Sequence, residues 1–275
     1  MNKNTIYYKY RGCSQRTWEI LVNRELYFSL SKDLNDPLDT STDIKKEYER
    51  AKEHIYRTDQ YPDKRKSFLI TMLDSINKKH PETGETLTLS EAITEFIKTR
   101  GILSLSKNPN DALLWSHYAD GHRGVCLGFS AEILEIRMGG SYGDVNYTTT
   151  PPYFEKFLEL TDEFGKFCKP WDNEKFSDEQ GKEFYNKQVT DLLSIGFYTK
   201  SKKWEYEEEF RLTSVPGNHP FPPSALKEVI LGAKISKKDE TTIRNFLINP
   251  IYSHVKIKRA YNIPGTFDFG SELAD

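Results

Sequence analysis

The chain has 275 residues, a formal net charge of −2, 37% hydrophobic residues and 29% charged residues. This length suits one large domain or two small ones, and the composition is too apolar for an intrinsically disordered chain. The nearly balanced charge excludes a strong overall attraction to nucleic acid or anionic membrane, although a local basic cleft is still compatible with it.

The first 31 residues predict a strand, a helix and a second strand. Residues 5–10 are rich in residues that favour strands, and residues 14–23 have apolar side chains at helical spacing behind Ser14, a suitable N-cap. Residues 25–31 again favour a strand, and the Asn-Asp-Pro sequence at 35–37 predicts the turn that follows it.

Charge density rises between residues 42 and 100, and apolar side chains recur there at helical spacing. Two or three helices are predicted, with breaks at residues 61–62 and 80–84, where proline and glycine occur. A second helical stretch is predicted over residues 153–199, interrupted at residues 170–171. We interpret both stretches as helical insertions between strands.

The central part of the chain predicts a strand over residues 101–106, a helix over 110–119 and a buried strand over 125–129. The segment between the last two contains the turn sequence Gly-His-Arg-Gly. Serines, histidines and an arginine lie at the ends of these strands and around this turn, and together they form a polar set.

The C-terminal part predicts a strand over residues 204–215, a proline-rich loop over 216–223, a strand over 226–231, a helix over 237–247 and a strand over 255–261. Scattered strands with helical insertions indicate an α+β fold with a mixed, mostly antiparallel sheet. We expect one domain spanning residues 1–275.

Cys13, Cys126 and Cys168 are isolated from one another, and an odd number of cysteines argues against a disulfide framework. The N-terminus lacks the apolar core of a signal peptide, and no segment approaches the roughly 18 apolar residues that span a bilayer. We therefore expect a cytoplasmic protein without a membrane partner.

The strand predicted over residues 204–215 begins with an unusual run of charges. Alternation along a strand predicts that Glu207, Glu209 and Arg211 share one face. One interpretation is an exposed edge strand that charges protect from aggregation. The other is a pair of carboxylates at the mouth of a cleft.

The sequence lacks the common signatures of catalysis. There is no His-Glu-x-x-His, no dinucleotide-binding or P-loop glycine pattern and no Gly-x-Ser-x-Gly elbow. No zinc site is predicted. A carboxylate site for Mg²⁺ stays open if Asp36, Glu207 and Glu209 converge.

Several segments together resemble an uncharacterised bacterial and phage family of domains of unknown function. They contain the motifs YKYR, LYFS, NDPxD, LSLS, LWSHYAxxHRG, KSxxWxYExEFR and KEVILG, at residues 8–11, 26–29, 35–39, 103–106, 114–124, 200–211 and 227–232. The resemblance extends over most of the chain, and it implies no particular activity.

A more distant similarity connects the chain to ADP-ribosyltransferase toxins. The order of Arg11 on the first strand, Ser29 on the second and Glu-x-Glu on a late strand is similar to the Arg–Ser–Glu order of those enzymes. The sequence departs from them because Leu-Tyr-Phe-Ser is not a full Ser-Thr-Ser and the insertions are long. The similarity implies a fold with split sheets and an enzyme that uses NAD as its substrate. Such an enzyme would be a toxin or an anti-phage defence effector.

The same similarity implies roles for particular residues. Glu209 would stabilise the positive charge that develops on the ribose, Glu207 would orient the acceptor, and Ser29 would hold the ribose. Arg11 would bind the pyrophosphate of NAD. The other residues that we expect at the cofactor are Tyr27, Ser104, Trp115, His117, Tyr118, Arg123 and Lys200.

Two further hypotheses belong to other classes. The first is a Mg²⁺-dependent nuclease or phosphodiesterase built on Asp36, Glu207 and Glu209. The second is a binding or regulatory module without catalysis, in which Glu207 and Glu209 pair with arginines in an internal ion network. The acceptor of ADP-ribose, either protein, nucleic acid or water, does not follow from the sequence.

Overall fold

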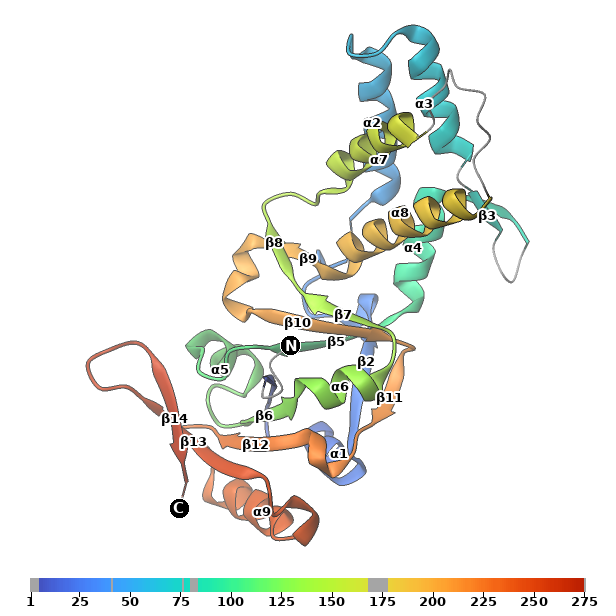
Figure 1. Cartoon of the computed structure of the whole chain (residues 1–275). Coiled ribbons are helices and arrows are strands. Elements are labelled where there is room, and N and C mark those ends of the chain that lie inside the picture. Colours follow the sequence, from blue (N-terminus) through green and yellow to red (C-terminus); the bar gives the residue numbers. More distant parts are fainter. Residues whose placement is uncertain (1–4, 41, 76, 80–83, 168–177, 275) are drawn as a thin grey trace. The chain divides into compact units, whose positions relative to one another are not determined.

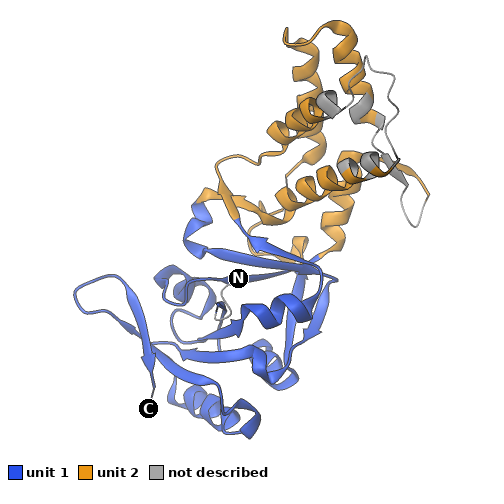
Figure 2. Cartoon of the chain, viewed as in Figure 1, with its two compact units in different colours: residues 1–29, 101–145, 203–275 blue, residues 30–100, 146–202 orange. Residues whose placement is uncertain are grey.

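The fold is known from a computed structural model, which describes residues 5–40, 42–75, 77–79, 84–167 and 178–274. The chain divides into two compact units (Figure 2). Unit 1 comprises residues 1–29, 101–145 and 203–275, and unit 2 comprises residues 30–100 and 146–202. Both predicted helical insertions, 42–100 and 153–199, lie within unit 2.

Unit 1 is built on a sheet to which ten strands contribute among the described residues (Figure 1). The order along the sheet is β11-β2-β5-β1-β6-β12-β13-β14, and β10 pairs with both β5 and β7. β12 and β13 are parallel, and β1 with β5 and β6, β10 with β5 and β7, β11 with β2, β12 with β6, and β13 with β14 are antiparallel, which confirms a mixed, mostly antiparallel sheet in an α+β fold. The strands are β1 (Ile6–Arg11), β2 (Glu25–Leu30), β5 (Gly101–Ser106), β6 (Val125–Ser130), β7 (Ser141–Asp144), β10 (Glu209–Ser214), β11 (Gly217–Pro220), β12 (Leu226–Leu231), β13 (Lys256–Asn262) and β14 (Phe269–Leu273).

The sheet is weakly joined between β5 and β1. Only Tyr8 and Ser106 are in register there, whereas β1 pairs with β6, and β5 with β10, through six residue pairs each. Because a strand pair is held by its ladder of hydrogen bonds, β5 and β1 diverge beyond this single contact. We refer to this place as the split.

The helices of unit 1 are α1 (Gln15–Asn23), α5 (Ala112–Tyr118), α6 (Ala131–Met138) and α9 (Lys237–Leu247), with the 3-10 turns η3 (Pro223–Ala225) and η4 (Pro250–Tyr252). The side chain of Ser236 caps α9 by accepting a hydrogen bond from the Asp239 amide. Ser14 does occupy the N-cap position of α1, but its side chain makes no capping hydrogen bond.

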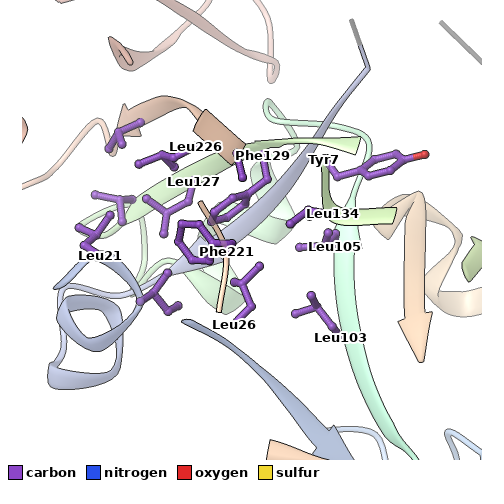
Figure 3. Packing of buried hydrophobic residues seen from close by; sticks show 14 of the residues in the cluster. Tyr7, Leu21, Leu26, Leu103, Leu105, Leu127, Phe129, Leu134, Phe221 and Leu226 are labelled. Atoms are coloured by element: carbon purple, nitrogen blue, oxygen red, sulfur yellow. The ribbon is translucent and has the colours of Figure 1, made fainter. Parts of the chain in front are cut away.

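Alternation along the strands divides the apolar side chains between two cores. Tyr7, Leu105, Leu127 and Phe129 lie in the larger core, which Figure 3 shows, and the ring of Tyr7 stacks on Phe210 with centroids 3.9 Å apart. The smaller core lies against α5 and consists of Tyr10, Leu114, Trp115, Ala119, Cys126, Ile230 and Ala260. Tyr118, which is discussed below, packs against this smaller core.

The predicted strand over residues 204–215 is wrong in its first part. The chain forms a 3-10 helix, η2 (Lys202–Glu207), and the strand β10 begins only at Glu209. Glu208 separates the two elements with a left-handed φ of 43°, which a strand residue does not adopt. The predicted proline-rich loop over 216–223 also contains a short strand, β11.

Unit 2 is mainly helical. Its elements are η1 (Ser31–Asp33), α2 (Ile44–Arg57), α3 (Asp63–Ser75), α4 (Leu89–Thr99), α7 (Tyr153–Phe167) and α8 (Asp178–Tyr198), with the short pairs β3 (Asn77–Lys79) with β4 (Thr86–Thr88) and β8 (Asn146–Thr148) with β9 (Thr199–Ser201). The predicted break at residues 61–62 separates α2 from α3, whereas that at 170–171 and most of that at 80–84 lie outside the described residues.

No helix in the described part of the chain has both the length and the apolar character needed to cross a membrane. Cys13 and Cys126 are free thiols, and Cys168 lies outside the described residues.

Candidate functional site

Four charged side chains gather where β1, β5 and β10 of unit 1 meet. They are Lys9 of β1, Glu207 at the end of η2, and Glu209 and Arg211 of β10, and we refer to them as the charged cluster. Glu209 lies opposite Ser106 of β5, and Arg211 lies opposite Ser104. The cluster therefore lies beside the split, where β1 leaves β5.

Glu209 and Arg211 form a buried, two-point ion pair. Arg211 donates from Nε to Oε1 of Glu209 at 2.7 Å and from Nη2 to Oε2 at 3.1 Å. Arg211 is 0% exposed and Glu209 is 4% exposed. The two residues share a face of β10 because side chains alternate along a strand, as the sequence predicted. The guanidinium fork thus fixes the orientation of the carboxylate.

Glu207 is also buried and is held from two directions. The hydroxyl of Tyr118, the last residue of α5, donates to Oε1 of Glu207 at 2.7 Å. The hydroxyl of Ser106 donates to the backbone oxygen of Glu207 at 2.7 Å. Tyr118 therefore contributes a hydrogen bond to the cluster, where the sequence predicted a ring that stacks on the cofactor.

The strained residue Glu208 stands between the two buried carboxylates. Its backbone oxygen accepts from the Lys107 amide at 3.0 Å, and its exposed side chain accepts from Nδ2 of Asn108 at 3.2 Å. A left-handed residue other than glycine costs on the order of 1–2 kcal/mol. The hydrogen bonds from the loop after β5 hold this conformation and so set where Glu207 and Glu209 lie relative to each other.

Lys9 extends across the split. Its ammonium donates to the backbone oxygen of Ser104 at 2.7 Å and thereby connects β1 to β5 where their ladder is missing. Burial, and to a smaller extent the charge of Arg11, lower the pKa of Lys9 from 10.5 to about 7, although Glu209 and Glu207 act in the opposite direction. Lys9 is therefore a cation whose charge is poorly stabilised at neutral pH.

The structure does not bring Ser29 to Glu209. A Cβ on Gly101 would stand 2.7 Å from Cβ of Phe28, so the neighbour Ser29 lies toward the Gly101 end of β5. Glu209 lies at the Ser106 end, about 17 Å along the strand at the usual rise of about 3.3 Å per residue. Ser104 and Ser106 are the serines that the sheet places beside Glu209.

Tyr27 and Arg11 belong to strands that do not pair with β10, the strand of Glu209 and Arg211. Tyr27 is 51% exposed and pairs with Asn218 of β11. Arg11 ends β1 opposite Val125, on the same side of the strand as Lys9. Burial lowers the pKa of Arg11, and the charge of Arg16 adds to that effect.

The three predicted residues around α5 and its following turn have different environments. Trp115 is 0% exposed in the smaller core, where its indole N–H donates to the Pro109 oxygen at 3.0 Å, so stacking on a cofactor would require it to leave that core. His117 and Arg123 are exposed. The Arg123 guanidinium donates to the Asp120 backbone oxygen at 3.5 Å.

Two predicted residues belong to unit 2. Lys200 lies on β9, is buried and stands 3.7 Å from a carboxylate oxygen of Asp39. Asp36 is buried and accepts a hydrogen bond from the Leu38 amide. Within the described ranges no group of three or more His, Cys, Asp or Glu side chains is placed to hold a metal ion.

Sequence reasoning missed Lys9 as a member of the site, and it placed Ser106 among the polar groups at strand ends without assigning it to the site. Both lie within motifs on which the family resemblance rests, YKYR and LSLS. The available signal was alternation, because Lys9 falls two residues before Arg11 and Ser106 two residues after Ser104. The role of Lys9 depends on the split between β1 and β5, which no local sequence pattern predicts.

Residues 114–212 match a family described as a protein of unknown function, DUF2971. The matched segment includes Glu207, Glu209 and Arg211 of the charged cluster, and also Tyr118, which donates to Glu207. No curated protein and no solved structure gives a match to the chain. Over residues 114–212 the chain is thus similar to a family of proteins of unknown function, as the resemblance led us to expect.

Proposed function

We propose that unit 1 is an NAD⁺-cleaving enzyme of the ADP-ribosyltransferase type, with the charged cluster as its active site. The observation that carries the proposal is the position of Glu209. It begins β10 opposite Ser106 of β5, and its charge acts on Lys9 of β1. A carboxylate, a hydroxyl and a cation from three strands thus meet at the split.

The reaction explains why a fixed carboxylate is needed there. The bond between C1′ of the ribose and the nicotinamide nitrogen breaks, and its electron pair leaves with nicotinamide. Positive charge then develops on the ribose, and a preorganised carboxylate stabilises it without having to reorient. The acceptor forms the new bond to C1′ and releases a proton. Water as the acceptor would make the protein an NAD glycohydrolase.

The roles within the site differ in part from those that the sequence implied. Glu209 stabilises the ribose cation, and Arg211 orients the Glu209 carboxylate through the two-point ion pair. Glu207, which Tyr118 holds, orients the acceptor. Ser104 and Ser106 replace Ser29 as the serines beside the ribose, and Lys9 joins Arg11 as a cation for the pyrophosphate.

The test compares two glutamates that lie four positions apart. Release of nicotinamide from NAD⁺ is measured for the wild type, for Glu209→Gln and for the matched control Glu205→Gln, whose side chain is exposed. We expect the wild type and Glu205→Gln to cleave NAD⁺ and Glu209→Gln to lose most of the activity. Equal turnover by Glu209→Gln and the wild type would reject the assignment of Glu209.

The burial of the ion pair supports a second candidate, a binding or regulatory module without catalysis. Arg211 at 0% exposure and Glu209 at 4% satisfy each other as an internal ion network would. Thermal-shift titration with NAD⁺ separates the candidates, because a ligand at about 100 times its dissociation constant adds about 2.7 kcal/mol to stability. The absence of any shift at millimolar NAD⁺ would favour the module.

A further inference from the structure

One edge of unit 1 consists of three loops packed against one another, and we refer to it as the rim. They are residues 12–14 after β1, residues 119–124 between α5 and β6, and residues 232–236 between β12 and α9. The Gly232 amide donates to the Gly124 oxygen at 2.9 Å, and the Lys234 amide donates to the His122 oxygen at 2.9 Å. A Cβ on Gly124 would stand 2.0 Å from the Arg11 oxygen, so glycine is required for this contact.

The rim has an excess of positive charge. Five exposed cations lie on its loops or in the helical turns that adjoin them, namely Arg16, Arg123, Lys234, Lys237 and Lys238. None of them forms an ion pair with a carboxylate in the part of the chain that the structure describes. By the same count the carboxylates are Asp120, Asp239 and Glu240. Asp239 already accepts a hydrogen bond from Ser236 at 2.6 Å, and Glu240 forms ion pairs with Arg244 and Arg259. The whole chain, by contrast, has a net charge of −2.

The fold leaves like charges close together at this edge. Burial lowers the pKa of Arg11 and the charge of Arg16 lowers it further, and the Nε atom of Arg11 is buried without a hydrogen-bond partner. Like charges that face each other without counter-ions cost free energy, which an anionic ligand would recover. The positive charges of the rim are thus not balanced within the rim, and an anion would be bound favourably there.

The surroundings of these cations favour one class of polyanion. No exposed large apolar side chain of the described residues lies on the three loops, whereas surface binding to a membrane uses inserted apolar groups. Protein interfaces also bury an apolar centre, while interfaces with nucleic acid are polar and strongly positive. Guanidinium groups in particular match the paired oxygens of phosphate.

We propose that the rim binds the phosphodiester backbone of nucleic acid, with Arg16, Arg123 and Lys234 each neutralising a phosphate. Binding of this kind is independent of base sequence and weakens steeply with salt. The inference rests on the rim alone and holds whether or not the charged cluster cleaves NAD⁺.

The experiment measures the fluorescence anisotropy of a labelled 20-base-pair DNA duplex, and of the single-stranded DNA and RNA of the same sequence, with the full chain at 50–200 mM salt. The test variant combines Arg16→Gln, Arg123→Gln and Lys234→Gln. The control combines Lys46→Gln, Lys64→Gln and Arg137→Gln, which remove the same charge from exposed positions outside the rim. Thermal melting verifies that both variants are folded.

We expect the wild type and the control to bind at least one of these nucleic acids. The rim variant should weaken binding at 50 mM salt by on the order of tenfold or more, and on the duplex its salt dependence should fall by about 0.9 in slope for each phosphate contact removed. Equal binding by the rim variant and the control would overturn the proposal, and so would no binding by the wild type at 50 mM salt. Rim-dependent binding to polyglutamate or to vesicles of anionic phospholipid, with none to nucleic acid, would also overturn it.

Discussion

The buried pair of Glu209 and Arg211 gives a prediction whose size follows from the structure. Replacing Arg211 with Met removes two hydrogen bonds from a carboxylate that is only 4% exposed. Breaking one partner of a buried ion pair costs about 3–5 kcal/mol, because the remaining charge stays in a poorly hydrated site. Replacing both partners with apolar residues of similar volume is far less costly. Arg211→Met and Glu209→Leu should therefore each destabilise unit 1 more than the combination of both substitutions does.

Tryptophan fluorescence in urea can measure this in unit 1 selectively. Three of the four tryptophans, Trp18, Trp115 and Trp204, belong to unit 1, so a Trp171→Phe background confines the signal to it. The double-mutant cycle should give a coupling free energy of at least about 3 kcal/mol between Glu209 and Arg211, because the double loss is smaller than either single loss. Additive losses, with coupling below about 0.5 kcal/mol, would refute the account of this pair as a mutually dependent unit.

Three further predictions concern single residues. The pKa of Lys9 is about 7 in the folded protein against an ordinary value of 10.5, so between these pH values the unfolded chain binds an extra proton. The free energy of unfolding should therefore rise between pH 7 and pH 9, by up to about 1.4 kcal/mol per pH unit. Urea titrations should show this rise in the wild type and not in Lys9→Met. Glu208→Gly should relieve the left-handed strain and raise the free energy of unfolding by up to about 1 kcal/mol, and a loss of stability in the same titrations would contradict the strain. Trp115→Ala should cost about 3–5 kcal/mol, measured by circular dichroism in urea, with a smaller loss for Trp115→Phe, and a loss below about 1 kcal/mol would contradict its place in the core.

Regular elements with strong local patterns were predictable from the sequence. The strands over residues 101–106 and 226–231 and the helix over 237–247 have the predicted bounds. Each has a clear apolar period, and the helix also has a capping serine with acidic residues in its first turn. Such signals come from neighbours in the chain, and a single sequence contains them.

The start of β10 was not predictable in the same way. Residues 204–208 alternate as a strand would, but Glu208 adopts a left-handed conformation and residues 202–207 form a 3-10 helix. The hydrogen bonds that hold Glu208 come from Lys107 and Asn108, about a hundred positions earlier in the chain. A tertiary contact therefore overrides the local pattern.

The membership of the site was only partly predictable. Glu207, Glu209, Ser104 and Tyr118 are brought together as candidates, whereas Ser29 was chosen because it lies on the second strand in the sequence. In the folded sheet, the strand that supplies serines beside Glu209 is β5, because β5 pairs with β10. Pairing between distant strands follows from the packing of the whole sheet, and neither composition nor spacing contains it.

Hydrogen exchange with and without NAD⁺ tests the central claim, that the charged cluster at the split is a dinucleotide site, most directly. The amides of residues 104–108, 110, 118 and 207–211 should exchange more slowly with NAD⁺ bound, because the ligand would hold the loop after β5 and the start of β10 in place. The hairpin of β13 and β14 serves as an internal control that should not change. Unchanged exchange at all of the cluster's residues under saturating NAD⁺ would contradict the account.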